Sequence, residues 1–413
     1  MAADPSFPPL FEVPYLRLFP WLRLFRAPGG AADPKRLILA AVGLLLMKAG
    51  WDGLDALFPA SAAVTSMIVT DFEPVSTLSA AAMAGRLAEP FVLIISPFRA
   101  LFDPATDATG FAHACLAALW ATLIWGLIGG AIARSAVVAF ARGDRLSWGQ
   151  IGRFLTSKAA PLVVTPLLPF VGVTIVAGSM ALFGLLYRIP GAFGGVAAGL
   201  LAFLPLIGGL LLALIVILLG TGWPLMHASV AAEAEDSFDA MSRAYAYVHQ
   251  RPWQLAGLAA LALVLGVVGL AFVELFARLV VTLTTWALSF GGSSSLVRGF
   301  HGDGHVKGAS AAAAAHAFWL SAVSLLTRGW VYSYFWTAAS VVYLLLRHEV
   351  DGTPFQTIAY EAPPNLLAEA AAGPMRTVLS YPIIVRKPGP APASTVPAPH
   401  STVSEGPGEA SGD

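Results

Sequence analysis

Residues 255–276 read LAGLAALALVLGVVGLAFVELF, an apolar run in which Glu274 is the only charged residue. An α-helix rises about 1.5 Å per residue, so a helix of this length covers the roughly 30 Å hydrocarbon core of a bilayer. The run therefore predicts a membrane-spanning helix, and it sets the pattern by which the rest of the chain is interpreted.

Five further stretches have the same length and apolar character. They are residues 37–57, 111–133, 162–186, 196–220 and 318–346. Backbone polar groups must be satisfied within the segment when a chain crosses lipid, which favours helices. We therefore expect an all-α fold, a polytopic transmembrane helix bundle of about six spans with short amphipathic surface helices.

The composition agrees with a chain that lies mostly in lipid. Hydrophobic residues make up 57% of the 413 residues and charged residues only 12%, and the mean hydropathy is +0.73. A soluble protein typically carries about 25% charged residues. The net charge of zero argues against nucleic acid as a partner, because phosphate binding needs an excess of Lys and Arg. The single cysteine, Cys115, excludes an internal disulfide framework.

The basic residues indicate the orientation of the spans. If the N-terminus is inside, the inner segments hold 16 Lys and Arg residues and the outer segments hold five. Inner loops of membrane proteins carry such an excess. We therefore expect a multi-pass protein of the bacterial inner (cytoplasmic) membrane with both termini in the cytoplasm.

The spans divide the chain into four regions. We expect a cytoplasmic interfacial segment at 1–36, the six-span domain at 37–347, a cytoplasmic post-membrane segment at 348–387 and a disordered tail at 388–413, which is rich in Pro, Ala, Ser and Gly. Residues 58–110 form a long outer loop. Its apolar piece at 91–102 is too short to span, and we expect a surface amphipathic helix or a re-entrant segment there.

An internal repeat follows three of the spans. Each copy has a capping residue, then an aromatic residue, then an aliphatic residue three positions after the aromatic one. Two of the three copies also end in an arginine. The members are Ser147, Trp148, Ile151 and Arg153 in the first copy, Ser237, Phe238, Met241 and Arg243 in the second, and Thr353, Phe355 and Ile358 in the third. Residues three apart share one face of a helix. We expect short cytoplasmic surface helices, near 147–158 and 237–250 and after the last span. They either dock a partner or anionic lipid, or simply connect the spans.

The pattern of these segments resembles a known group of proteins. SFDAMSRAYAYVHQRPW at 237–253 and YLLLRHEVDGTPFQTI at 343–358 are similar to segments of uncharacterised bacterial polytopic proteins, including the membrane domain found beside glycerophosphodiester phosphodiesterases. The resemblance covers roughly 111–358 and implies a helical membrane domain. It supplies no catalytic residues, because the acidic and histidine cluster of the soluble phosphodiesterase domain does not occur in this sequence.

Ionisable residues inside spans are the main candidates for a functional site, since each costs a few kcal/mol at the bilayer centre unless it is satisfied. Arg328 lies within the sixth span and is expected to pair with Glu274 of the fifth. Glu274 has an alternative partner in Arg278, one turn further along. The pair serves either a transport pathway or the attachment of two helices to each other.

Two further clusters are candidates of a weaker kind. Lys48, Asp52 and Asp55 near the end of the first span form either a cation or proton site or a polar surface where the helix leaves the membrane. His301, Asp303 and His305 in a Gly-rich outer loop are either ligands of zinc or copper or a solvated loop.

The sequence contains no H-E-x-x-H zinc helix, no G-x-S-x-G nucleophile elbow and no P-loop. We therefore assign no catalytic residue and no cofactor. The predicted function is a membrane scaffold or a subunit that organises lipid, membrane-protein partners or copies of itself. The alternative is a permease for a small solute or ion that uses Arg328 and Glu274.

Overall fold

The computed structural model describes residues 19–59, 79–103, 105–189, 192–290 and 311–359. Within these residues the chain forms helices and connecting turns and contains no β-strand. The predicted all-α bundle is confirmed. The outer loop at 291–310 and the tail at 388–413 lie outside the described residues.

Seven helical segments are long and apolar enough to cross a membrane, one more than predicted. They are α3 (Pro34–Leu57), α4 (Ala80–Leu101), α5 (Ala108–Arg142), the segment Trp148–Arg188, α9 (Phe203–Glu233), α11 (Pro252–Ser289) and α13 (Ala311–Asp351), whose apolar part is Phe318–Asp351. The segment Trp148–Arg188 comprises α6 (Trp148–Val164), η3 (Thr165–Leu167), α7 (Leu168–Gly184) and η4 (Leu185–Arg188). The chain is thus a multi-pass membrane protein by the length and composition of its helices.

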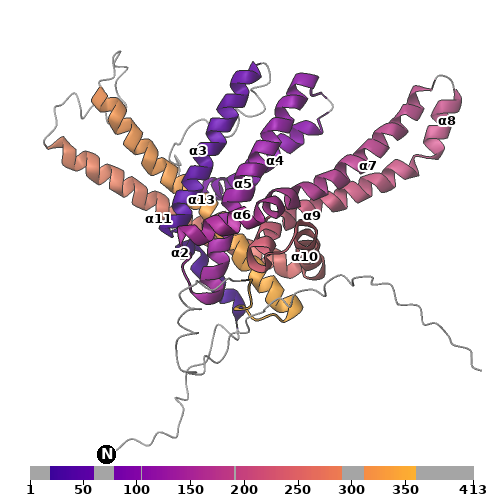
Figure 1. Ribbon diagram of the computed structural model, residues 1–413. Helices are drawn as coiled ribbons and strands as arrows, with labels where there is room; N and C mark the ends of the chain where they lie inside the picture. Colours follow the sequence, from indigo (N-terminus) through magenta and orange to yellow (C-terminus); the bar gives the residue numbers. More distant parts are fainter. Residues whose placement is uncertain (1–18, 60–78, 104, 190–191, 291–310, 360–413) are drawn as a thin grey trace, which may run out of the picture. The chain divides into compact units, whose positions relative to one another are not determined.

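The additional helix, α4, runs parallel to α3. Asp55 near the end of α3 contacts His113 near the start of α5, and Arg36 near the start of α3 bonds Ser135 near the end of α5, so α3 and α5 are antiparallel. Residues 102–107 join the end of α4 to the start of α5, which makes α4 antiparallel to α5 as well. Both α3 and α4 therefore point away from the same end of the bundle (Figure 1).

The remaining six helices still alternate in direction along the chain, so α4 is an insertion into the predicted pattern. The apolar piece at 91–102 is the second half of a helix that begins at Ala80 and buries Met83, Leu93, Ile94 and Phe98, which is longer and more buried than the surface helix that was one alternative; the other alternative, a re-entrant segment, stays a prediction. The helix packs against α5, α11 and α13. The charges and prolines of this stretch lowered its hydropathy, while Ser79 caps the helix by accepting a bond from the Ala82 amide at 3.2 Å.

The C-terminal parts of α5, α9 and α13 meet α2 (Ala27–Ala31) and α10 (Ser237–Gln250) in a buried region that we call the hub. The side chains buried there include Trp125, Trp336, Tyr343 and Tyr247. In the apolar stretch of α13, 89% of the residues are buried, whereas in the apolar stretch of α9 only 6% of the residues are buried. The hub is therefore the packed core, and the distal parts of the helices face lipid.

The helices α7 and α9 form a hairpin that extends away from the hub, with α8 (Ala192–Leu200) at its tip (Figure 1). Exposed large apolar side chains run along it, among them Ile175, Leu182, Leu206 and Ile217. An exposed apolar surface of this extent is stable only in an apolar solvent, and the bilayer supplies that solvent.

Helices are present at the first two of the predicted positions, α6 and α10. In α6, Ser147 and Gln150 form both bonds of a capping box, and α10 is capped by Asp236, which accepts a bond from the Asp239 amide at 3.0 Å. The α6 helix continues through a kink at Lys158 toward α7. The helices α6 and α10 each connect two long helices and change the direction of the chain next to the hub.

The prediction of a third surface helix at 353–358 is wrong. Residues Thr353–Ile358 form a turn after Gly352, which ends α13 with a φ of +63°. Phe355 and Ile358 are buried, and the Ala359 amide donates to the Ala232 carbonyl at 2.8 Å. Packing into the hub replaces the helix that the capping pattern favoured.

The N-terminal segment has a buried side and an exposed aromatic side. The helix η1 (Pro20–Arg26) buries Leu24, while Phe19, Trp21 and Phe25 remain exposed. It packs on α13 and α2. This part of the predicted interfacial segment is thus anchored to the hub on one face; residues before Phe19 lie outside the described residues.

Close packing of α5 on α6 gives a first test. A Cβ atom at Gly126 would lie 2.9 Å from the Leu162 carbonyl oxygen, a backbone atom that cannot move aside. We expect Gly126→Val to destabilise the protein by about 1–3 kcal/mol, the usual cost of overpacking. Thermal unfolding in detergent, followed by tryptophan fluorescence, measures the change.

Gly178→Val is the matched control, because no atom lies within 4 Å of a Cβ at Gly178 in α7. It should unfold like the wild type. Equal unfolding temperatures for the two variants would show that α5 and α6 do not pack at this distance.

Candidate functional site

A pocket with a volume of about 310 Å³ lies between α4, α11 and α13. Its polar lining residues are Arg86, Glu274, Arg278, Thr282, Ser321, Ser324, Thr327 and Arg328. This charged pocket stands inside helices that are otherwise apolar. Ionisable groups in such segments are costly and mark functional positions by default.

An ion pair between α13 and α4 holds the pocket wall together. Arg328 Nε lies 2.8 Å from Glu89 Oε1, and the two side chains are only 11% and 12% exposed. The Tyr332 hydroxyl donates to the same Glu89 oxygen at 3.2 Å, and Arg86 lies 3.8 Å from the other carboxylate oxygen. Glu89 thus has two cations and a hydroxyl around it, so its charge is well compensated.

The residues singled out from the sequence meet at this pocket. Arg328, Glu274 and Arg278 all line it, and Glu274 is 4% exposed. The structure adds Glu89 and Arg86, which the sequence analysis left in an outer loop. Their spacing of three residues in an Ala-rich stretch before Pro90 was an available indication of a helix with a charge pair.

Among the residues that the structure describes, Arg86, Arg278, Arg328 and Glu274 are the ionisable residues that line the pocket, and Glu89 pairs with Arg328 behind them. Guanidinium groups offer planar forks of N–H donors to carboxylates and phosphates. The arrangement is suited to binding an anion.

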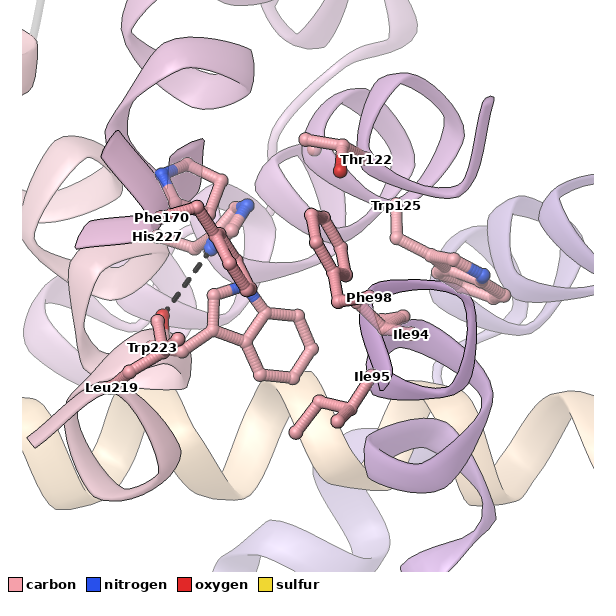
Figure 2. A pocket seen from close by; sticks show the side chains of 11 residues that line it. Ile94, Ile95, Phe98, Thr122, Trp125, Phe170, Leu219, Trp223 and His227 are labelled. Carbon is pink, nitrogen blue, oxygen red and sulfur yellow. Dashed lines mark hydrogen bonds between the residues drawn. The ribbon is translucent and has the colours of Figure 1, made fainter. Parts of the chain in front are cut away.

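A second pocket lies between α4, α5, α7 and α9 (Figure 2). Phe98 stacks on Phe170 with 3.8 Å between ring centroids, and Trp223 and Trp125 form further walls. His227 is buried at its edge, with Nδ1 3.4 Å from the Trp223 carbonyl oxygen. The volume of about 20 Å³ is room for one water molecule, so this aromatic pocket is part of the packing.

Buried arginines tie the hub together, and the sequence analysis recorded them only as orientation signals. Arg134 donates to the carbonyl oxygens of Ala231 at 2.6 Å and Ala359 at 2.5 Å. Arg347 pairs with Glu233 and donates to the Pro354 carbonyl at 3.1 Å. These bonds join α5, α9 and α13 to the turn that follows α13.

Arg243 of the internal repeat binds carboxylates of the hub. It pairs with Glu235 and lies 3.8 Å from Asp351. Burial raises the pKa of the Glu235 carboxyl group, and the attraction of Arg243 opposes that rise. Burial acts to lower the pKa of Arg243, but Glu235 outweighs it and the pKa is raised. Arg243 therefore stays charged, and its role in α10 is attachment.

The other repeat residues divide between the hub and the surface. In α6, Ile151 is buried, and Trp148 and Arg153 are exposed. In α10, Phe238 is exposed and Met241 is partly buried. In both of these copies the aromatic residue is therefore exposed, whereas the aliphatic residue is buried or partly buried.

The polar cluster at the end of α3 links α3 to α5. Lys48 and Asp52 form the i,i+4 ion pair expected from their spacing, at 3.0 Å. Asp55 lies 3.2 Å from Nε2 of His113, a fully buried residue of α5 that the sequence analysis passed over. The Asp52 side chain is 62% exposed, which fits the interpretation of a polar helix end.

His301, Asp303 and His305 lie outside the described residues. Among the residues that the structure describes, no three His, Cys, Asp or Glu side chains are grouped so as to hold a metal ion. The metal site in the outer loop remains a prediction.

The Arg328–Glu89 pair gives a second test. We expect Arg328→Gln alone to lower stability by about 3 kcal/mol, because it leaves the buried Glu89 carboxylate with less compensation. The double variant Arg328→Gln, Glu89→Gln should recover much of this loss. Thermal unfolding of the wild type, the two single variants and the double variant in detergent gives the interaction energy of the pair as a double-mutant cycle.

The exposed pair Lys48–Asp52 is the control for this cycle. Its single variants should change stability by less than about 1 kcal/mol. An Arg328→Gln or Arg328→Leu variant as stable as the wild type would show that the pair does not hold α13 to α4.

Comparisons of the chain with protein-family models, with curated proteins and with solved structures find no match. The similarity to the membrane domains that accompany glycerophosphodiester phosphodiesterases stays a prediction from the sequence, and function is inferred from the sequence and the structure of this chain alone.

Proposed function

We propose that this chain is a non-catalytic membrane protein that organises anionic lipid around its hub. We place it in the bacterial inner membrane with the hub and both termini on the cytoplasmic side. The six alternating helices and the excess of basic residues at the hub ends of the helices support this orientation.

The observation that carries the proposal is a set of exposed aromatic residues at the hub ends of the helices, which we call the hub rim. It consists of Phe19, Trp21, Phe25, Trp148, Phe238 and Trp253. Trp253, at the start of α11, is 88% exposed. Aromatic residues in such positions are typical of the headgroup layer, where one part of the ring is apolar and another is wet.

Exposed arginines accompany the rim. Arg145 lies three residues before Trp148 and Arg153 five residues after it, and Arg251 lies two residues before Trp253; all three arginines are exposed. Each basic residue near an anionic leaflet contributes about 1 kcal/mol of attraction. The protein has no net charge, so this attraction is local to the rim. Combined aromatic and basic side chains support selection of anionic over zwitterionic lipid.

A second candidate function is a permease for a small solute or ion. The specific observation in its favour is the charged pocket, where ionisable side chains from three helices gather inside apolar segments. Uptake of a labelled anion into vesicles that contain the purified protein would decide for this candidate.

The test of the proposed function compares lipid retained by the purified protein. The wild type, reconstituted in mixed phosphatidylglycerol and phosphatidylcholine, should retain an excess of phosphatidylglycerol. The triple variant Arg145→Gln, Arg153→Gln, Arg251→Gln should lose this excess, by up to about fivefold per arginine, as expected from about 1 kcal/mol each. Mass spectrometry of the bound lipid measures the ratio.

The control is the double variant Arg99→Gln, Arg188→Gln. It removes two exposed arginines that lie at the ends of α4 and η4 distant from the hub. It should retain the wild-type lipid ratio. An unchanged ratio in the triple variant, or an equal loss in the control, would contradict the role of the rim.

A further inference from the structure

We propose that the helix ends opposite the hub carry a second aromatic surface, which lies in the headgroup layer of the outer leaflet. It consists of Tyr187, Trp286 and Trp319, and we call it the outer belt. The proposal includes a steep tilt of the hairpin formed by α11 and α13. It rests on the placement of the hub rim in the inner headgroup layer, which is part of the proposed function.

The exposed tryptophan and tyrosine side chains of the described residues fall into two groups. Trp21, Trp148 and Trp253 belong to the hub rim, and the other three form the outer belt. All remaining Trp and Tyr side chains of the described chain are buried or partly buried. Trp and Tyr are enriched at both membrane–water interfaces. Their absence from the exposed surface between the two groups is the distribution that a bilayer produces.

The outer ends of α11 and α13 form one aromatic surface. Trp286 packs edge-on against Phe290, with 5.0 Å between ring centroids, and Trp319 packs in the same way against Phe318 at 5.3 Å. These four side chains are between 60% and 75% exposed. The two helices stay adjacent toward this end, because residues 281–282 of α11 and 320–321 of α13 line the same pocket.

Tyr187 has surroundings of the same kind at the end of another segment. It lies in η4, is 58% exposed and packs edge-on against Phe183, with 6.3 Å between ring centroids. The next residue, Arg188, is exposed. An aromatic ring with a hydroxyl group suits the headgroup layer, because the ring contacts acyl chains while the hydroxyl and the neighbouring guanidinium meet water and phosphate.

The length of α11 argues that its outer end is in contact with lipid. The helix has 38 residues and extends about 57 Å, nearly twice the roughly 30 Å of a hydrocarbon core. Large exposed apolar side chains occur from its first turn to its last, among them Trp253, Val268, Leu279 and Leu288. An upright helix with Trp253 at the inner surface would place the last two of these in water, where an extended apolar surface is unfavourable.

A tilt brings both ends of α11 to membrane surfaces. Along the helix axis Trp253 and Trp286 are about 50 Å apart, whereas a bilayer with its headgroups is about 40–45 Å thick. A tilt of about 30–40° from the bilayer normal matches the two lengths and lies at the upper end of the range for transmembrane helices. The Tyr334 hydroxyl of α13 donates to the Ala262 carbonyl of α11, so α13 shares this tilt.

The experiment measures the depth of spin labels in the bilayer. Cys115 is the only cysteine of the chain, so Cys115→Ser gives a background in which one introduced cysteine is labelled. Trp253→Cys, Val268→Cys and Trp286→Cys are each labelled with a nitroxide and reconstituted in vesicles of phosphatidylglycerol and phosphatidylcholine. Relaxation by oxygen, which concentrates in the bilayer core, and by a water-soluble nickel chelate reports the depth.

We expect the labels at 253 and 286 in the headgroup layer and the label at 268 in the core, with a several-fold higher ratio of oxygen to nickel accessibility at 268. Because α11 is continuous between the labels, two headgroup depths determine its tilt. Circular dichroism establishes that each labelled variant is folded. Trp319→Cys repeats the measurement on α13 and should give the depth found at 286.

A pair of matched variants tests whether the aromatic rings fix this depth. The double variant Trp286→Leu, Trp319→Leu keeps the surface apolar but removes the rings that prefer the headgroup layer. It should move a label at Ser289→Cys deeper into the bilayer. Phe272→Leu, Phe276→Leu, which changes exposed aromatics between the two belts, should leave that label where it is.

Three results would overturn the proposal. A label at 286 with the accessibility of a site in water would show that the outer end of the hairpin projects from the membrane, and one as deep as 268 would show that it ends in the core. Dipolar broadening between labels at 286, removed by dilution with unlabelled protein, would show that a second copy covers this surface. A label at 253 outside the headgroup layer would instead refute the placement of the hub rim, and the tilt with it.

Discussion

The contact between Gly129 of α5 and Trp336 of α13 determines how the rest of the molecule is assembled. A Cβ atom at Gly129 would lie 2.4 Å from the Trp336 ring, so the indole occupies the space that the missing side chain leaves. This allows α5 and α13 to run close together, with Trp125 stacked on Tyr332 one turn away. The helices α3, α4 and α9 each pack on both members of this pair.

Around the α5–α13 pair, charged groups are placed where other helices can compensate them. Arg134 and Arg347 cap backbone carbonyls where the helices end in the hub. Arg328 is satisfied from the side, by a carboxylate of α4. In lipid such compensation is a condition for the helix to remain in place, since water cannot substitute for a missing partner. Arg134, Arg328 and Arg347 therefore lie where helices of the described chain contact one another.

Much of the architecture was predictable from the sequence, because span length and the distribution of basic residues are local properties. The runs 111–133 and 255–276 both lie within observed helices, and the Ser147 capping box formed as its spacing indicated. The helix α4 was not predicted, because Arg86, Glu89 and two prolines interrupt its hydropathy. Its stability depends on contacts with helices far along the chain, which no local pattern records.

The same limit applies to the site. Arg328 and Glu274 could be singled out as costly groups inside spans, and they do line one pocket. That Glu89 lies beside Arg328 follows only from the position of α4. At 353–358 the local sequence favours a helix that the structure does not form. Its residues match a helix-capping pattern, but burial of Phe355 in the hub stabilises a turn instead.

The parallel placement of α4 has a consequence for the order in which the protein is made. Glu89 and its hydrogen-bond partner Tyr332 are 243 residues apart in the chain. At about 5–20 residues per second, roughly 12–50 s separate their synthesis. For that time Glu89 has Arg86 of its own helix nearby but lacks the Arg328 guanidinium and the Tyr332 hydroxyl of α13. The pocket between α4, α11 and α13 is therefore complete only after α13, the last of the long helices, has been synthesised.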